Sequence, residues 1–96
     1  MIDSNLLGRY EYHDGDNSKK YWWLVFDKDS RQYIAYWGRI KHRETPRATV
    51  YVGDDVATKK VKEKLKKGYM HRQGFDTEIG SNAGHFIMSI LEKEAA

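Results

Sequence analysis

Four segments of the chain have the pattern of hydrophobic and polar positions that is typical of β-strands. Large aromatic residues alternate with polar ones over residues 9–13, and an apolar aromatic run fills residues 21–26. A similar pattern resumes after a short polar turn over residues 32–39, and a β-branched segment covers residues 48–52. We therefore predict four strands, the second and third of which form an antiparallel hairpin, after a loose lead-in over residues 1–8.

The spacing of hydrophobic residues changes after the fourth strand and predicts a helix over residues 56–67. Ala57, Val61 and Leu65 lie four residues apart, so they form one narrow apolar stripe along a surface that is otherwise rich in lysine. Asp54 precedes this stripe and is predicted to cap the start of the helix. The pattern is that of one basic helix that packs across a sheet.

A second helix is predicted near the C-terminus. Residues 69–80 read as a connector, after which Ser81 or Asn82 can cap a helix whose apolar residues recur every three or four positions. These apolar residues are Ala83, Phe86, Ile87, Ile90 and Leu91. We expect this helix to close the core or to cover the open side of the sheet, with a partner surface as the alternative. The fold class predicted for the whole chain is α+β: a small antiparallel sheet of about four strands, one basic helix packed on it and an additional C-terminal helix.

The composition indicates a single packed domain that spans residues 1–96. Hydrophobic residues make up 40% of the chain, and three Trp, seven Tyr and three Phe residues supply a modest core. The chain has no cysteine and no apolar stretch of the ~18–20 residues that a membrane span needs, and its start lacks the pattern of a signal peptide. We therefore expect an intracellular protein without a membrane partner, located in the cytoplasm or, in a eukaryote, in the nucleus.

Charge is distributed unevenly along the chain. The net charge is +3, but residues 37–72 contain eleven basic and four acidic residues and carry +7. The other sixty residues contain six basic and ten acidic side chains and carry −4. This asymmetry favours an anionic partner, and a lysine-rich helix that is simply solvated is the alternative interpretation.

The candidate binding residues begin where the third strand ends. The tripeptide Trp37-Gly38-Arg39 places a flat ring, a residue without a side chain and a guanidinium group in a row, which suits contact with a nucleic-acid backbone or terminus. The glycine would let another backbone approach closely. Because side chains alternate along a strand, Tyr36 and Trp37 should lie on opposite faces, one in the core and the other toward solvent or a partner.

Basic residues close to Trp37 are the predicted phosphate contacts. Those in or beside the following loop are Arg39, Lys41, Arg43 and Arg47, and those on one face of the helix are Lys59, Lys62 and Lys66. Another face of the helix is formed by Lys60, Lys64 and Lys67. An ordinary solvated surface is the alternative interpretation of the loop and the helix, and a half-buried core position is the alternative for Trp37.

The sequence contains none of the patterns that mark common catalytic or metal sites. The four histidines are dispersed and lack ligand spacing. The acidic turn that begins at Asp14 has Lys19 and Val25 where a calcium loop needs glycine and glutamate. Neither a nucleophile elbow nor a phosphate-binding glycine loop is present. We therefore expect that the protein is not an enzyme and that it requires no cofactor or metal ion.

The order of these features resembles that of the WGR domain, a family named after the tripeptide found here at residues 37–39. The resemblance covers about residues 9–70 and includes the aromatic strand that begins at Tyr21, the lysine-rich helix and the sequence Lys67-Gly68-Tyr69. It leaves residues 71–96 as a C-terminal extension. The family occurs in DNA-dependent poly(ADP-ribose) polymerases and in bacterial proteins, and the fold that it implies is a small antiparallel sheet with one helix against it.

The resemblance implies a DNA-binding role. In the polymerases the domain binds broken or nicked DNA, where its tryptophan packs on a sugar at the strand terminus and nearby basic residues hold the phosphates. By resemblance, Trp37 would be the packing platform, and Arg39 would bind the backbone or tie the domain to a neighbour. The chain departs from the family at Lys41, where members commonly have glycine, and it contains no polymerase domain, so polymerase activity is not implied.

Two principal functions are predicted. The first is a non-catalytic nucleic-acid-binding module that contacts DNA ends, nicks or backbone through Trp37, Arg39 and the basic loop and helix. The alternative is a protein-interaction module, or a small regulator or inhibitor encoded by a phage or mobile element, that grips an acidic protein surface with the help of residues 71–96. A third is a DNA-sensing subunit whose catalytic partner is a separate chain.

Overall fold

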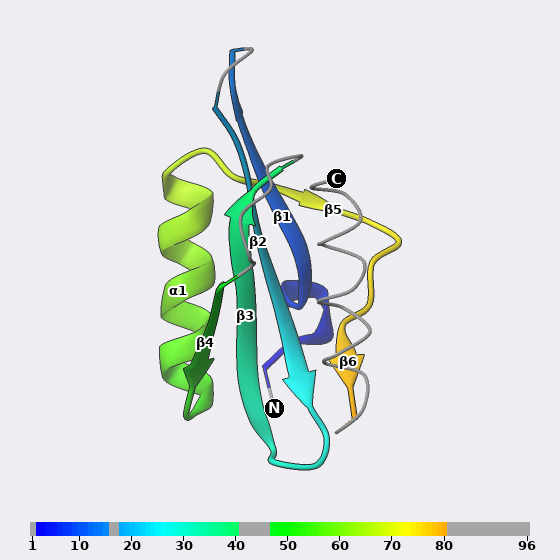
Figure 1. The fold of residues 1–96 in the computed structure, drawn as a ribbon. Coiled ribbons are helices and arrows are strands. Elements are labelled where there is room, and N and C mark those ends of the chain that lie inside the picture. Colours follow the sequence, from blue (N-terminus) through cyan, green and yellow to red (C-terminus); the bar gives the residue numbers. More distant parts are fainter. Residues whose placement is uncertain (1, 16–17, 41–46, 81–96) are drawn as a thin grey trace.

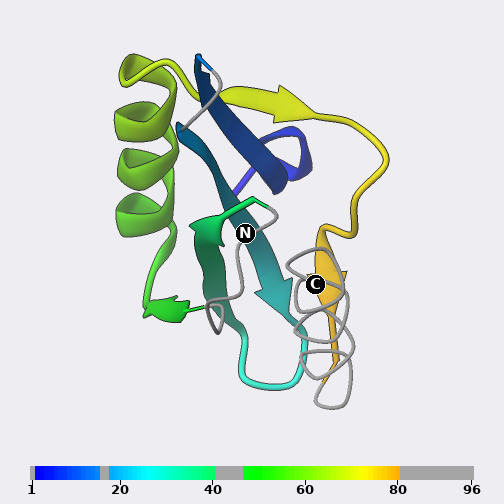
Figure 2. The same ribbon diagram turned by 45° about the horizontal axis from the view of Figure 1, so that its top comes forward.

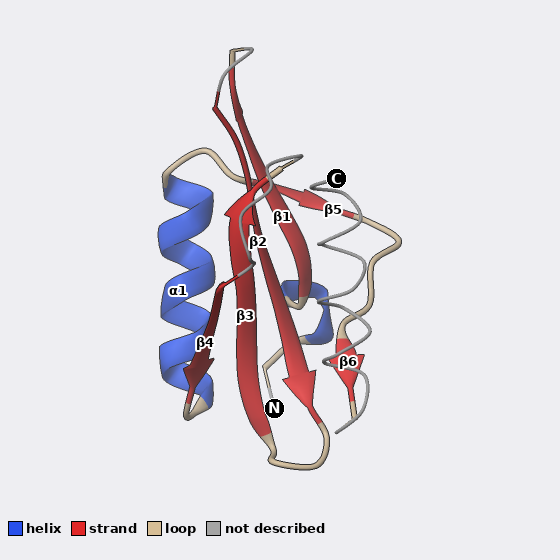
Figure 3. Ribbon diagram, viewed as in Figure 1, coloured by secondary structure: helices blue, strands red, loops and turns tan. Residues whose placement is uncertain are grey.

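The computed structural model describes residues 2–15, 18–40 and 47–80 of the chain. These residues form one sheet, one α-helix and a short 3-10 helix, so the fold is α+β and consists mostly of sheet (Figure 1, Figure 3). In chain order the elements are η1 Ser4–Leu6, β1 Gly8–Asp14, β2 Ser18–Asp27, β3 Gln32–Arg39, β4 Arg47–Tyr51, α1 Asp54–Lys66, β5 Met70–Arg72 and β6 Glu78–Ile79. No helix in this part of the chain is long and apolar enough to cross a membrane.

Five strands form a continuous ladder in the order β4-β3-β2-β1-β5, and each neighbouring pair is antiparallel. The predicted hairpin of the second and third strands is confirmed: β2 and β3 pair from Lys20–Arg39 at one end to Asp27–Gln32 at the other. β6 pairs in parallel with the end of β2 and adds a sixth strand. Figure 2 shows the connection from β5 to β6 running along the edge of the sheet away from α1.

The sheet has more strands than the sequence pattern predicts. β5 and β6 lie in residues 69–80, so the interpretation of this segment as a plain connector is wrong. With three and two residues, these strands are too short to show a periodic pattern, and they are defined by their pairing with β1 and β2. The predicted C-terminal helix falls on residues 81–96, which lie outside the described part of the chain.

The helix-side core is built from alternate residues of the three central strands. Its strand residues are Tyr10, Trp22, Leu24, Tyr33 and Ala35, which pack against Ala57 and Val61 of α1. The N-terminal segment also contributes to this core: Ile2 and Leu7 are buried there, and the Ile2 N–H donates a hydrogen bond to the Tyr33 hydroxyl at 2.9 Å. Residues 2–7 are therefore part of the folded domain rather than a loose lead-in.

The start of α1 differs from the prediction. The N-cap residue is Gly53, with φ 96°, and Asp54 is the first residue of the helix rather than its cap. The Asp54 carboxylate instead accepts a hydrogen bond of 2.5 Å from the Tyr33 hydroxyl, which lowers the pKa of Asp54. The N-terminal end of the helix is thereby fixed to the start of β3. The predicted apolar stripe ends early, because Leu65 is 47% exposed while Ala57 and Val61 are buried.

A second core cluster occupies the opposite face of the sheet. Its buried residues are Tyr21, Trp23, Val25, Tyr36 and Ile79. Arg9 is buried beside them, and its guanidinium lies 5.1 Å from the Tyr21 ring and 4.9 Å from the Phe75 ring. Its Nε donates to Glu11 at 2.8 Å, so this buried cation has both a counterion and aromatic faces around it.

We expect Glu11→Gln to destabilise the fold by about 3 kcal/mol, because it removes the carboxylate charge that pairs with the buried guanidinium of Arg9 at 2.8 Å. Burial alone would raise the pKa of Glu11, but the hydrogen bond to His13 and the charges of Arg9 and Arg72 outweigh it and lower the pKa. A carboxyl pKa that is lower in the folded state stabilises the fold at pH values above 4.5, the ordinary pKa of the group. This contribution is lost as the pH falls through the pKa of Glu11 in the folded protein. Urea unfolding across this range should therefore show a flatter pH dependence for the variant.

The matched control is Glu78→Gln, because Glu78 forms an exposed ion pair with Lys28 at 3.5 Å. Exposed pairs contribute about 0–1 kcal/mol, so this variant should unfold close to the wild type. Equal unfolding free energies for the two variants would contradict the stabilising role assigned to the pair of Arg9 and Glu11.

Candidate functional site

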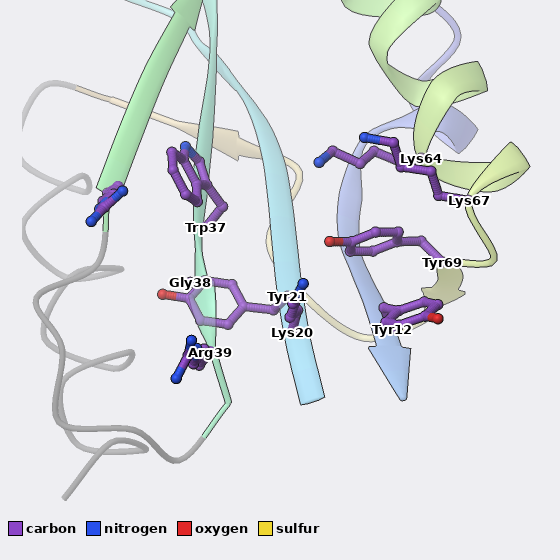
Figure 4. A pocket seen from close by; sticks show the side chains of 10 residues that line it. Tyr12, Lys20, Tyr21, Trp37, Gly38, Arg39, Lys64, Lys67 and Tyr69 are labelled. Carbon is purple, nitrogen blue, oxygen red and sulfur yellow. The ribbon is translucent and has the colours of Figure 1, made fainter. Parts of the chain in front are cut away.

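A groove of about 670 Å³ lies at the end of the sheet where β3 and α1 both finish (Figure 4). Its lining residues are Tyr12, Lys20, Tyr21, Trp37, Gly38, Arg39, Arg47, Lys64, Lys67 and Tyr69. Five of these are cationic, four are aromatic, and none of the described lining residues is acidic. The groove therefore combines concentrated positive charge with flat apolar surfaces.

Strand register brings the lining residues of the sheet together. Tyr12 of β1 pairs with Lys20 of β2, and Lys20 pairs with Arg39 of β3, so these three residues form one row across three strands. Paired residues of neighbouring strands point to the same face, and in this row it is the face that carries α1. Trp37 lies on the same face two residues before Arg39 and pairs with Trp22 of the core.

Trp37 is half-buried and held in a fixed orientation. Its indole Nε1 donates to the Thr49 hydroxyl at 3.1 Å, and the Arg47 guanidinium lies 5.3 Å from the ring centroid. Tyr36, its neighbour, is 6% exposed and belongs to the core cluster of the opposite face. The predicted alternation is confirmed: Tyr36 is the core residue, and Trp37 contacts the core while it lines the groove.

The space beside Gly38 is tight for a reason that the sequence does not reveal. A Cβ atom added to Gly38 would lie 3.1 Å from the Tyr21 hydroxyl oxygen and 3.4 Å from Cζ of the same ring. Tyr21 is opposite Gly38 in the β2–β3 register, and its ring is buried. The close approach at Gly38 is therefore made by a tyrosine side chain of the same molecule.

Lys64 connects the helix to the aromatic part of the groove. It follows Val61 by three positions and Ala57 by seven, which places it on the inner stripe of α1. Its ammonium lies 5.0 Å from the Tyr69 ring and 5.7 Å from the Trp22 ring.

The surroundings of Lys64 disfavour its positive charge. Burial lowers its pKa, and repulsion from Lys67 and Lys60 lowers it further. The charge of Glu63, which also pairs with Lys60 at 3.3 Å, raises the pKa of Lys64 but does not cancel this effect. An anion in the groove would relieve this repulsion.

Tyr12 and Tyr69 form an aromatic pair in the groove wall, with ring centroids 5.4 Å apart. Tyr69 follows a turn at Gly68, which has φ 100° and ends the helix α1. A side chain there would also lie 3.3 Å from the Tyr12 ring. In Figure 4, Lys64, Tyr69 and Tyr12 follow one another along the wall opposite Trp37 and Arg39, and Lys20 lies between the two walls.

The groove contains only some of the residues predicted from the sequence. Three of them, Trp37, Arg39 and Arg47, line it. The helix residues Lys59, Lys62 and Lys66 are exposed and are not part of its lining. The predicted contacts Lys41 and Arg43 lie outside the described residues.

Other lining residues were not among the predicted contacts, namely Tyr12, Lys20, Tyr21, Lys64, Lys67 and Tyr69. The helical spacing from Val61 is a signal that could have selected Lys64, since it marks the inner face of α1. The position of Tyr12 and Lys20 depends on the register of the β1–β2 hairpin, which the sequence pattern alone does not define.

Comparison with protein-family models, with curated proteins and with solved structures finds no match to this chain. The resemblance to the WGR family thus depends on the sequence motifs alone. The structure itself defines the class of molecule as a small α+β domain with a basic, aromatic groove at one end of its sheet.

We expect Gly38→Ala to be tolerated better when the hydroxyl of Tyr21 is absent, since that oxygen is the closest atom to the added methyl group. A double-mutant cycle with Tyr21→Phe should give a coupling free energy of about 1 kcal/mol, with Gly38→Ala costing more in the wild-type background. The free energy of unfolding of all four proteins is measured in urea. The cycle removes any general effect of alanine in a strand, and equal costs in both backgrounds would contradict the steric role of Gly38.

Proposed function

We propose that the protein is a non-catalytic nucleic-acid-binding module that contacts DNA ends, nicks or backbone through the groove around Trp37. The observation that carries this proposal is the gathering of five cations and four aromatic residues in one groove whose described lining has no acidic residue. Phosphate backbones are bound by such cations, and the flat faces of sugars and bases pack on aromatic rings.

Each part of the groove has a role in this proposal. Arg39 and Arg47 are exposed and offer planar forks for phosphate oxygens, whereas Lys20, Lys64 and Lys67 act as point charges. Trp37 offers a ring held by Thr49, which suits packing on a sugar or base at a strand terminus. Contacts of this kind position a backbone and recognise its shape rather than its base sequence. The WGR resemblance assigns Trp37 the same role.

The protein-interaction alternative depends on the apolar residues of the segment 71–96, most of which lies outside the described part of the chain. No contact among the described residues favours it over DNA binding. It is therefore an outcome of the experiment below rather than a second proposal.

The proposal predicts salt-sensitive binding that favours free ends or nicks. Fluorescence anisotropy with labelled blunt, nicked and hairpin-closed duplexes should give an affinity that falls with a log–log slope of about −0.9 per phosphate neutralised. Trp37→Ala removes the ring but none of the five cations, so it should reduce the preference for ends and leave the salt dependence in place. Equal binding to closed hairpins would reduce the function to a nonspecific basic surface, and no binding even at low salt would favour a protein partner.

Two adjacent lysines provide a matched test of the groove. Lys67 lines it and Lys66 does not, although both are exposed at the end of α1. Lys67→Gln should reduce the magnitude of the salt slope by about 0.9, the value for one phosphate contact. Lys66→Gln removes the same charge and should have a much smaller effect in the same titration. Equal effects would show that the whole helix surface, and not the groove, attracts DNA.

A further inference from the structure

The two walls of the groove each carry an aromatic platform. Trp37 is on the wall formed by β3, and the pair of Tyr12 and Tyr69 is on the wall formed by β1 and the segment after α1. The Tyr69 ring lies between the Lys64 ammonium and the Tyr12 ring, which is tilted by 36° from it, so Tyr12 is the last of these three groups. Tyr12 is half-buried, which leaves part of its ring open to the groove.

The floor between these walls is narrow. The row that runs from Tyr12 on one wall past Lys20 on the floor to Arg39 on the other wall spans two inter-strand spacings, or about 10 Å. The major groove of B-DNA alone is about 12 Å wide, so a whole duplex cannot enter a groove of this width. A single strand can enter it.

The positions of the cations also suit a single strand. Arg39 lies on the wall of Trp37, Lys64 and Lys67 lie on the opposite wall, and Lys20 lies on the floor between them. A strand in this position would have positive charge on both sides of its backbone. A cationic groove with separate stacking platforms is the arrangement that binds unpaired nucleotides, because their bases are free to stack on protein rings.

We propose that the groove holds an unpaired single strand of DNA next to a duplex end, with one base on Trp37 and another on the ring of Tyr12. This inference rests on the DNA-binding function proposed above and adds the form of DNA that the groove accepts. The backbone between the two bases passes Lys20, and the adjoining duplex stays outside the groove.

The test compares two duplexes, each closed by a hairpin at one end and open at the other. The open end is blunt in the first duplex and carries a short single-stranded overhang in the second. Fluorescence anisotropy should show about tenfold tighter binding of the overhang, the effect expected from stacking one additional base. Tyr12→Leu should lower the affinity for the overhang about tenfold more than it lowers the affinity for the blunt end, so that the difference between the probes is lost. Tyr12→Phe, which keeps the ring, should preserve the difference. Circular dichroism verifies that both variants are folded.

The remaining outcomes separate this inference from the proposed function. If the blunt and overhang probes bind equally and with salt sensitivity, the single-strand inference is overturned and the DNA-binding function stands. If Tyr12→Leu and Tyr12→Phe lose the preference for the overhang equally, the role assigned to the ring is overturned. If neither probe nor a free single strand binds, both proposals fail together.

Discussion

The rest of the structure depends on the register between β2 and β3. This register pairs Trp22 with Trp37 on the helix-covered face, and a shift by one residue would turn Trp37 to the opposite face. The turn between the strands contributes to fixing it: the Asp27 carboxylate accepts hydrogen bonds from the Asp29 N–H at 3.1 Å and the Ser30 hydroxyl at 2.9 Å. A few polar contacts at one end of the hairpin thus help to decide which side chains line the groove at the other end.

The groove gathers like charges that repel one another. Burial and the neighbouring lysines lower the pKa of Lys64, and the nearby carboxylate of Glu63 compensates this only in part. By contrast, the buried cation Arg9 pairs with Glu11 among aromatic rings. The contrast between a paired cation in the core and cations in the groove that are at most partly compensated is typical of a surface that binds an anion.

Long periodic segments made much of this fold predictable. The β2–β3 hairpin, α1 and the opposite directions of Tyr36 and Trp37 follow from local spacing, which the sequence contains in full. The short strands β5 and β6 depend on pairing with distant strands and leave no local pattern. In the groove, Lys64 could have been selected from its spacing to Val61, whereas Tyr12 could not, because its position depends on the pairing of a separate hairpin.

The groove and the core share residues. Trp37 packs against the helix-side core and also lines the groove, and the Lys64 ammonium lies near the core ring of Trp22. Side chains held by a core lose little conformational freedom when a ligand arrives, so less of the binding free energy is spent on ordering them. Because Trp37 belongs to both the core and the groove, a change that loosens the core also loosens the Trp37 ring in the groove. Among the described residues, the strands β1, β2 and β3 and the end of α1 therefore set most of the geometry of the groove.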